Sequence, residues 1–410
     1  MTLSEELTWR GLINQTTLDD VKKLDDKTWT FYHGFDASAD SQAIGNLAAM
    51  MVDRVFLKHG SKGILLAGGG TSLIGDPGGK DVERPLQSKE TIAHNTEAAR
   101  KQLEIILAGY EFTTLNNIDW LEKLTVVDFL RDIGKHFGMS TLVQRDYIQK
   151  RIGKGGDGMS YTEFSYTLLQ GYDFLHLNQE YNCDLQLSGA DQWGNCLSGV
   201  DLIRKVNGSS VHALTMPLII NKATGKKFGK SEEGAVWLDE SKTSVYQFYQ
   251  FWLNTDDDAV EDYLKIYTLI EPAELEALLV EFRANPSDRQ AQKYLAFEVT
   301  KLVHGEKRAL SVQNVSEVLF GSRQFSELSQ DDIVELSKEI PVVESTGLVE
   351  LLVTAGLASS NSEANRFIQS GAISVNQKKI ESVEQFETLD DVGSHLLLKR
   401  GKNGFALIKR

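Results

Sequence analysis

The chain has 410 residues, of which 41% are hydrophobic and 25% are charged, a composition typical of a globular protein with two or three domains. A formal net charge of -15 argues against indiscriminate binding to nucleic acid or to anionic membranes, but it leaves room for a specific RNA partner reached through local basic patches. The two cysteines, Cys183 and Cys196, have no metal-ligand or redox spacing, which favours a reducing compartment. The N-terminus lacks an apolar segment, and no run approaches the roughly 20 apolar residues of a membrane span. We therefore expect a cytoplasmic protein that makes no use of a membrane.

The first part of the chain alternates strand and turn signals. Residues 28–33 are rich in β-branched and aromatic residues, which predicts a strand, and a small-residue turn at 34–41 leads to a helix over 43–59. A second strand at 63–67 enters a glycine-rich loop at 68–80. This order predicts a parallel α/β sheet with its ligands beyond the carboxyl ends of the strands. Leu73 occupies the place of the last glycine in a dinucleotide fingerprint, which argues against a nicotinamide enzyme.

Helices are predicted at 88–108 and 126–137, followed by a third that begins at 161. In the second, apolar residues recur at helical spacing and indicate core or subunit contact: Val127, Leu130, Ile133 and Phe137. In the third, Tyr166, Gln170 and Asp173 fall on one face. A phenol, an amide and a carboxylate on a single face predict the wall of a polar pocket, with a solvated helix face as the alternative. A strand at 184–187 and a turn into a helix at 188–195 follow.

A basic loop follows the apolar run 216–220. Residues 225–231 read Gly-Lys-Lys-Phe-Gly-Lys-Ser, in which lysines supply point charges and glycines let the backbone close around an anion. The spacing of a P-loop fails by one residue, because Thr224 stands where its first glycine would be. The segment predicts a mobile polyphosphate-binding loop, and a solvated hairpin tip is the alternative that the residues alone leave open.

Helical periodicity dominates after residue 235, over 243–253, 259–268, 273–283 and 289–304. We therefore expect a catalytic domain at 1–234 and a helical domain at 235–320, with a linker at 321–346. A small terminal domain at 347–410 carries two helices, a strand at 372–376 and the basic stretch 399–402.

Five segments in this order, 36–46, 68–80, 161–173, 189–195 and 227–231, resemble the bacterial tyrosyl-tRNA synthetases, a family of class I aminoacyl-tRNA synthetases. The resemblance covers nearly all of the chain, and the terminal unit is similar to the RNA-binding module first named for a small-subunit ribosomal protein. It implies a Rossmann-like parallel-sheet catalytic domain with an inserted dimer-forming segment, then an all-α domain on the anticodon side and a small α+β RNA-binding domain. It also implies a homodimer that uses L-tyrosine, ATP with Mg²⁺ and tRNA(Tyr), with no tightly bound protein-ligated metal.

In this family the tyrosine carboxylate attacks the α-phosphate of ATP, and the tyrosyl group then passes to the tRNA. The resemblance assigns the phenol to Tyr32 and Asp173, and the ammonium group to Asp76, Tyr166 and Gln170. The catalytic residues that it implies are Lys80, Arg84, Lys227, Lys230 and Ser38. For ATP it implies Asp36, Gly45, Asn46, Gly189, Asp191, Gln192, Lys230 and Ser231. For tRNA, our candidates are Arg366, Lys399, Arg400 and Lys402.

The sequence departs from the family at two places. The first signature normally begins with histidine, but here it reads Ala43-Ile44-Gly45-Asn46, so one donor to the phosphates of ATP is missing. We expect weakened activation, with the four basic residues retaining most of the effect. The terminal helix, around Arg366, has fewer arginines than usual, which predicts weaker phosphate contact. Two alternatives follow: a catalytically impaired paralogue that acts as an RNA-binding or regulatory protein, and a tyrosine-activating ligase that does not use tRNA.

Overall fold

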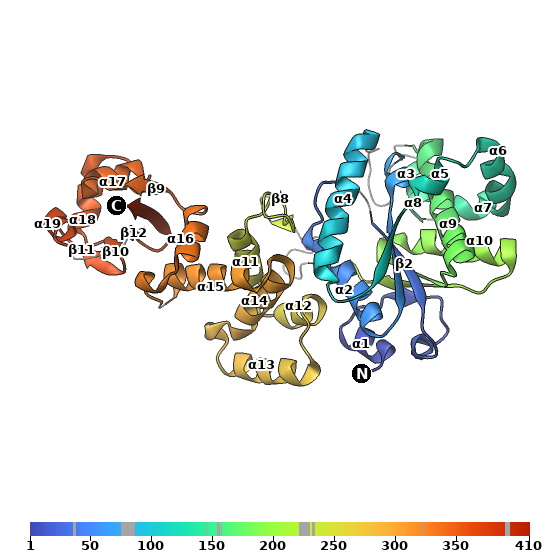
Figure 1. The fold of residues 1–410 in the computed structure, drawn as a ribbon, viewed down its shortest axis with the longest axis horizontal. Helices are drawn as coiled ribbons and strands as arrows, with labels where there is room; N and C mark the ends of the chain where they lie inside the picture. Colours follow the sequence, from blue (N-terminus) through green and yellow to red (C-terminus); the bar gives the residue numbers. More distant parts are fainter. Residues whose placement is uncertain are drawn as a thin grey trace. The chain divides into compact units, whose positions relative to one another are not determined.

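The computed structural model describes residues 1–35, 38–74, 87–144, 146–153, 156, 158–220, 230–231, 234–321, 323–389 and 394–410 (Figure 1). The chain divides into two compact units. The first comprises Met1–Thr243 and Thr255–Ala291, and the second comprises Ser244–Asn254 and Gln292–Arg410. Within the described ranges, no helix is both long and apolar enough to cross a membrane.

The first unit is built on a six-stranded sheet in the order β1-β6-β5-β2-β3-β4. The strands are β1 (Gln15–Thr16), β2 (Thr30–Phe35), β3 (Lys62–Ala67), β4 (Phe112–Asn116), β5 (Leu185–Gly189) and β6 (His212–Met216). Neighbouring strands are parallel except β1, which runs antiparallel to β6. The predicted parallel α/β sheet is confirmed, although β1, β4 and β6 were not expected from the sequence.

Helices cover both faces of this sheet (Figure 1). On one face lies α2 (Ile44–Lys58), with α4 (Lys89–Ile106) beside it; on the other lie α9 (Tyr161–Tyr181) and α10 (Trp193–Asn207). Successive side chains of β2 point to opposite faces. Phe31 therefore meets Phe56 of α2 at 5.3 Å between ring centroids, whereas Tyr32 meets Phe174 of α9 at 5.1 Å. A strand buried on both sides explains the apolar run of β2.

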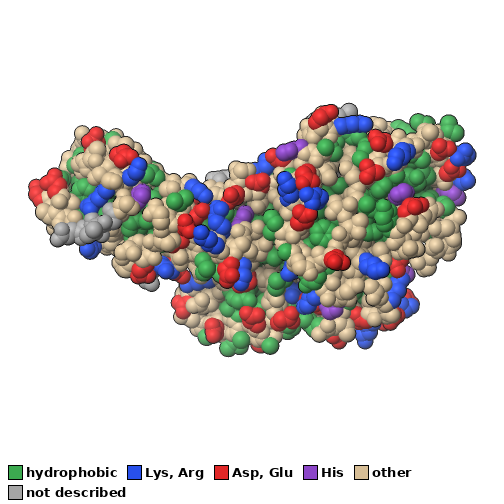
Figure 2. Space-filling view, in the orientation of Figure 1, with side chains coloured by type: hydrophobic (Ala, Val, Ile, Leu, Met, Phe, Trp, Pro, Cys, Tyr) green, Lys and Arg blue, Asp and Glu red, His purple; other side chains and the backbone are tan. Residues whose placement is uncertain are grey.

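The segment between β4 and α9 consists of short turns of helix. These are α5 (Ile118–Leu121), α6 (Val126–Asp128), a π-turn (Phe129–Ile133), a 3₁₀ turn (Gly134–His136), α7 (Met139–Leu142) and α8 (Asp146–Ile152). The single helix predicted over 126–137 is wrong, because the π-turn breaks the helical register. Ile133 is buried, but Val126, Val127 and Leu130 are 74%, 67% and 53% exposed. Figure 2 shows hydrophobic side chains gathered over α6.

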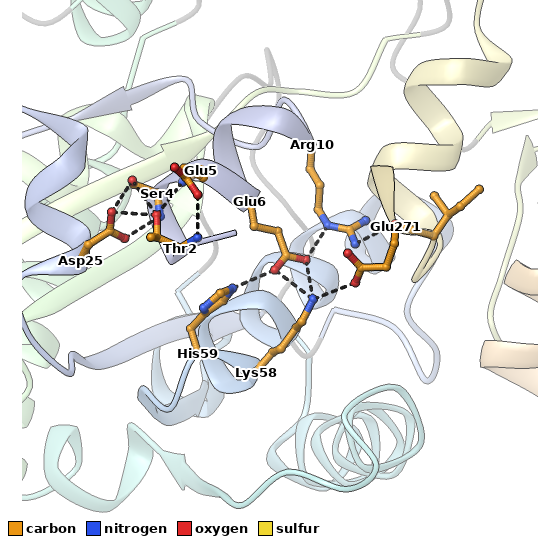
Figure 3. A network of polar contacts seen from close by, with 10 residues as sticks. Thr2, Ser4, Glu5, Glu6, Arg10, Asp25, Lys58, His59 and Glu271 are labelled. Carbon is orange, nitrogen blue, oxygen red and sulfur yellow. Dashed lines mark hydrogen bonds and ion pairs between the residues drawn. The ribbon is translucent and has the colours of Figure 1, made fainter. Parts of the chain in front are cut away.

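A buried polar network fastens α2 to the rest of the first unit (Figure 3). Glu6, on α1 (Leu3–Trp9), is 1% exposed and contacts Arg10 at 3.0 Å, Lys58 at 3.0 Å and His59 at 2.8 Å. Lys58 and His59 end α2, and Lys58 also contacts Glu271 at 3.2 Å. The Arg10 guanidinium donates to main-chain oxygens at the end of α12 (Val260–Tyr267), those of Lys265 at 2.7 Å and Thr268 at 2.9 Å. Next in the chain comes α13 (Pro272–Ala284).

The second unit combines helices with a five-stranded sheet in the order β11-β10-β12-β13-β9. The strands are β9 (Val342–Glu344), β10 (Ile373–Val375), β11 (Lys378–Ile380), β12 (His395–Arg400) and β13 (Gly404–Lys409). The helices are α11 (Val245–Leu253), α14 (Gln290–His304), α15 (Glu306–Phe320), α16 (Gln330–Ser337), α17 (Leu348–Thr354), α18 (Asn361–Gln369) and α19 (Val383–Glu387). One core joins the sheet to α17 and α18, and a second core joins it to α15 and α16.

The segment 321–346, which we expected to be a linker, is structured. It contains α16 and β9, and β9 pairs in parallel with β13 of the terminal sheet. Only a few apolar anchors, such as Phe325, Leu336 and Val343, are buried in this otherwise polar stretch. Such sparse anchors gave no clear periodicity in the sequence. The division of the chain into four regions otherwise stays a prediction.

Candidate active site

A cavity of about 350 Å³ lies at the carboxyl ends of β2 and β5, between α2 and α9. Its walls include predicted site residues from four separate segments of the chain: Tyr32, Asn46, Tyr166, Gln170, Asp173, Gly189, Asp191 and Gln192. The carboxyl ends of parallel strands are where the topology places a ligand site. The sequence thus identified residues that the fold brings together, and their individual roles stay predictions.

Asp173 lies on the α9 wall and is 3% exposed. Its carboxylate accepts hydrogen bonds from Asn117 Nδ2 at 2.9 Å and from Trp120 Nε1 at 2.8 Å. Both donors are neutral, so burial dominates and raises the pKa of Asp173 to about 7. The carboxyl group can therefore gain or lose its proton near neutral pH, depending on what it meets in the cavity.

Two further buried polar atoms near Asp173 lack a partner. The Tyr32 hydroxyl and Gln186 Oε1 make no hydrogen bond, although these residues are only 1% and 2% exposed. Tyr32 and Gln186 stand opposite each other in the β2–β5 register, and both line the cavity. Unpaired buried polar groups are costly, so this end of the cavity is built for a ligand that bears a hydroxyl or a similar polar group.

The sequence reasoning missed Gln186. It lies in β5 between Leu185 and Leu187, in a strand that is buried on both faces. A polar side chain in such an apolar parallel strand is the signal that could have found it.

Tyr166, Gln170 and Asp173 of α9 all line the cavity. They lie on one face of the helix, as their spacing in the sequence predicts. The helix begins at a capping box in which Ser160 accepts from the Glu163 main chain and the Glu163 side chain accepts from the Ser160 main chain. This cap fixes where α9 starts and thereby which residues face the cavity.

The start of α2 forms another part of the rim. Ala43 is the N-cap and offers no side-chain hydrogen bond, while Gly45 and Asn46 are exposed in the first turn. The main chain here pairs with the segment that follows the lysine loop: Ile44 N donates to Val236 O at 3.0 Å, and Leu238 N donates to Gln42 O at 2.9 Å. The signature turn is therefore attached to the base of the lysine loop.

Gly189, Asp191 and Gln192 lie where β5 ends and a 3₁₀ turn (Ala190–Gln192) begins. A Cβ atom at Gly189 would lie 2.8 Å from Asp191 Oδ1, so a side chain there would displace this carboxylate from the strand end. Gln192 Oε1 accepts from Asn195 Nδ2 at 2.8 Å, and Asn195 Oδ1 accepts from the Thr167 hydroxyl at 2.7 Å. These bonds join α9 to α10 at the cavity.

A histidine–aspartate pair on the cavity wall was also missed. His33 Nδ1 lies 2.9 Å from the carboxylate of Asp53, which is 1% exposed. Burial lowers the pKa of His33, but the Asp53 carboxylate outweighs it and the net pKa is raised. The two residues lie twenty positions apart on β2 and α2, so no local pattern could have revealed the pair.

Several predicted residues cannot be placed. Asp36, Asp76, Lys80, Arg84 and Lys227 fall outside the described residues. Lys230 and Ser231 form β7, but their side chains are likewise outside what the structure describes. Ser38 is exposed, and its main-chain oxygen accepts from Gln87 at 3.0 Å. Among the described residues that line the cavity there is no lysine or arginine.

The four predicted tRNA-binding residues of the second unit do not form one patch. Arg400 and Lys402 line an open cavity of about 440 Å³, and Arg366 lies beside it over the Phe367 ring. Lys399 points to the other face of β12, where its Nζ donates to Leu319 O at 3.4 Å. In the parts of the chain that are described, no group of three or more His, Cys, Asp or Glu side chains could hold a metal ion.

Two family models match the chain. The model described as "tRNA synthetases class I (W and Y)" covers residues 24–321. The model described as "Tyrosine--tRNA ligase SYY-like C-terminal domain" covers residues 332–408.

Full-length relatives carry a consistent name. A Tyrosine--tRNA ligase of Geobacillus kaustophilus is 46% identical over 422 residues and covers 100% of each chain. One of Corynebacterium diphtheriae is 44% identical over 423 residues, covering 100% of this chain and 99% of that protein. Among solved structures, a C-terminally truncated mitochondrial tyrosyl-tRNA synthetase of Aspergillus nidulans is 30% identical, with a TM-score of 0.70 over 78% of this chain and 94% of its own. An Archaeoglobus fulgidus tyrosyl-tRNA synthetase, 16% identical with a TM-score of 0.55 over 76% of this chain and 100% of its own, shares the fold.

Proposed function

The chain belongs to the class I tRNA synthetases of the tryptophan and tyrosine type, and from this we propose that it activates L-tyrosine with ATP and transfers the tyrosyl group to tRNA(Tyr). Full-length similarity to proteins named Tyrosine--tRNA ligase supports tyrosine over tryptophan. The alternative of an RNA-binding paralogue gains no support, because these relatives carry the ligase name over the entire chain.

The observation that carries the proposal is the polar end of the cavity. The unpaired Tyr32 hydroxyl and the Asp173 carboxyl are both buried and both line the cavity. A phenol can donate to the carboxylate and accept from the hydroxyl, and so it satisfies both groups. Phenylalanine would fill the same space and leave them unpaired, with the full desolvation penalty.

The first reaction is an in-line displacement. An oxygen of the tyrosine carboxylate bonds to the α-phosphorus of ATP, the bond to the bridging oxygen breaks, and pyrophosphate leaves. Such a transfer depends on positioning and on charge stabilisation rather than on a nucleophilic side chain. Since the described cavity lining holds no lysine or arginine, we assign the cations to Lys80, Arg84, Lys227 and Lys230, with Mg²⁺ accompanying ATP.

The remaining roles are proposed from the family resemblance. Tyr166 and Gln170, together with Asp76, bind the tyrosine ammonium group. The exposed first turn of α2, with Gly45 and Asn46, leaves room for the nucleotide. We assign its ribose and phosphates to Gly189, Asp191 and Gln192, which line the cavity, and, from the resemblance alone, to Asp36, Ser38, Lys230 and Ser231.

We further propose a cytoplasmic homodimer. The inserted segment leaves Val126, Val127 and Leu130 exposed, and such an apolar face is suited to a second copy of the chain. We propose the cytoplasm because the charged tRNA would serve protein synthesis there.

The test is tyrosine-dependent exchange of labelled pyrophosphate into ATP, followed by charging of tRNA(Tyr). We expect exchange with tyrosine, little or none with phenylalanine or tryptophan, and charging when tRNA is added. If folded protein binds tyrosine but shows neither exchange nor charging, the proposed function is wrong and the RNA-binding alternative takes its place.

A further inference from the structure

The open cavity of the second unit has the chemistry of a nucleotide-binding site. It is lined by residues of α18, of the segment before β10, of the end of β12 and of the turn that leads into β13: Phe367, Ala372, Arg400, Gly401, Lys402, Asn403 and Gly404. No acidic side chain is among these lining residues. The chain as a whole carries a net charge of -15, so an open cavity with two cations and an aromatic ring stands out against it.

The aromatic ring is layered with guanidinium groups. The Arg400 Cζ atom lies 5.1 Å from the Phe367 ring centroid, and the Arg366 Cζ atom lies 5.6 Å from it. Guanidinium and aromatic planes are the surfaces on which unpaired RNA bases stack. A site that held only phosphate would need the charges but not the ring.

The strand-to-strand turn keeps space open beside this layer. Gly401 has φ +59°, a left-handed conformation, and its N–H donates to Ala372 O at 3.1 Å, which ties the turn to the end of α18. At Gly404, a Cβ atom would lie 3.4 Å from Arg400 Nε and 2.9 Å from Arg400 O, so any side chain there would crowd the arginine. The turn is thus shaped to hold Arg400 against Phe367.

The basic side chains of the site differ in how freely they can contact a phosphate. Arg366 contacts Glu363 at 3.2 Å, so its charge is partly compensated. Within the described residues, no ion pair joins Arg400 or Lys402 to a carboxylate, although the charge of Arg400 helps to lower the pKa of Glu363. Lys402 is exposed. Lys402 can therefore meet a phosphate at the rim while Arg400 remains layered on the ring.

We propose that Phe367 and Arg400 form a stacking site for one unpaired nucleotide of the tRNA, with Lys402 contacting its phosphate. The inference rests on the proposed function, because it takes tRNA as the RNA that the second unit meets. It adds a contact to a base, whereas the sequence analysis predicted only basic residues for tRNA binding.

The test compares two substitutions that preserve charge or packing in the full-length protein. Phe367→Leu removes the π face but keeps an apolar side chain against the core of α17 and α18, and Arg400→Lys keeps the charge but loses the plane. We expect each to weaken tRNA(Tyr) binding about tenfold, with an unchanged dependence of affinity on salt. The matched control, Lys402→Gln, should lower the salt slope by about one unit, because it removes a phosphate contact.

A second readout locates the nucleotide. Unpaired positions of the tRNA are replaced one at a time by 2-aminopurine, whose fluorescence is quenched on stacking. We expect one position to be quenched by the unmodified protein and not by Phe367→Leu or Arg400→Lys. Wild-type affinity in Arg400→Lys, or no quenched position, overturns the stacking site. Tyrosine-dependent pyrophosphate exchange should be unaffected in Phe367→Leu, so a failure of the stacking site is distinguishable from a failure of the proposed function.

Discussion

Asp173 and Glu6 are both buried carboxylates of the first unit, but their surroundings are opposite. Asp173 accepts hydrogen bonds from the neutral donors Asn117 and Trp120, and burial raises its pKa to about 7. Burial also acts to raise the pKa of Glu6, but hydrogen bonds from His59, Lys58 and Arg10 outweigh it and lower the pKa. Among the described residues no cation contacts the Asp173 carboxyl where it faces the cavity, whereas Arg10, Lys58 and His59 contact the Glu6 carboxylate where it joins helices.

The difference separates a structural carboxylate from a functional one. A buried charge destabilises the fold by several kcal/mol unless partners stabilise it. A buried carboxyl without such partners is therefore typical of a functional site. Glu6 receives this stabilisation within the fold from Arg10, Lys58 and His59. For Asp173 we propose that the missing partner is the phenol of the bound tyrosine.

The largest effect that we expect concerns the stability of the Glu6 network. Glu6→Gln removes the one carboxylate on which Arg10, Lys58 and His59 converge, and it should lower the free energy of unfolding of the first unit by about 3 kcal/mol. Urea unfolding checks this. Asp19→Asn is the control, because it breaks an exposed ion pair with Lys23 and should change little. Equal losses in both variants would contradict the contrast drawn above.

Asp173→Asn should affect substrate selection instead. We expect kcat/KM for tyrosine in pyrophosphate exchange to fall about 10- to 100-fold, which is the loss of one hydrogen bond to a charged group, with the KM for ATP unchanged. Tyr32→Phe should give a smaller loss, since a neutral hydrogen bond is removed. If Asp173→Asn retains the wild-type preference for tyrosine over phenylalanine, Asp173 does not read the phenol.

The two carboxylates should also give opposite pH dependence of stability. Glu6 has a lowered pKa in the folded state, so it stabilises the fold at neutral pH, and this contribution is lost as the pH falls below about 4.5. Asp173 has a raised pKa in the folded state. Its ionisation therefore lowers the free energy of unfolding as the pH rises from about 4 to about 7.

Unfolding midpoints between pH 3 and pH 8 measure both effects, since each pKa unit by which a group differs between the folded and the unfolded protein contributes about 1.4 kcal/mol. At acidic pH, where Glu6 is protonated in the wild type, Glu6→Gln should become as stable as the wild type. Asp173→Asn should gain stability relative to the wild type between pH 4 and pH 7. Parallel profiles for the two variants would rule out opposite pKa shifts.

The smallest effect concerns the donor missing at the start of α2. Ala43→His should speed adenylate formation by about threefold to fivefold without much change in ATP affinity. We expect less than the ~100-fold effect that one oxyanion-hole donor can have, because the lysines and Arg84 already stabilise the phosphates. Ala43→Leu, which adds bulk without a donor, should give no gain. Rapid-quench kinetics measure the step, and a flat rate in Ala43→His would show that the phosphates are stabilised in another way.

The sequence could predict those features of the fold and the site that depend on the spacing of residues close together in the chain. The one-faced set Tyr166, Gln170 and Asp173 follows from helical periodicity, and the parallel sheet follows from the alternation of strands and glycine turns. The family resemblance then connected these segments with Tyr32, which is distant in sequence.

What could not be predicted depends on tertiary pairing. The His33–Asp53 pair joins a strand to a helix, and Gln186 meets the cavity only because β5 lies beside β2. Strand β9 exists because it pairs with β13, more than sixty positions later, so its three residues gave no signal of their own. The break at Phe129–Ile133 is likewise invisible to apolar spacing, which looks helical across it.

The most direct test of the role of Asp173 is the proton balance of tyrosine binding, measured by calorimetry in buffers of different ionisation enthalpy. A phenol that donates to the carboxylate favours its ionised form. At pH 6, where Asp173 with a pKa of about 7 is mostly protonated, tyrosine should therefore release close to one proton. The release should vanish above pH 8, and it should be absent with phenylalanine and in Asp173→Asn. Tyrosine binding at pH 6 without proton release would contradict the assignment of Asp173 as the group that reads the substrate hydroxyl.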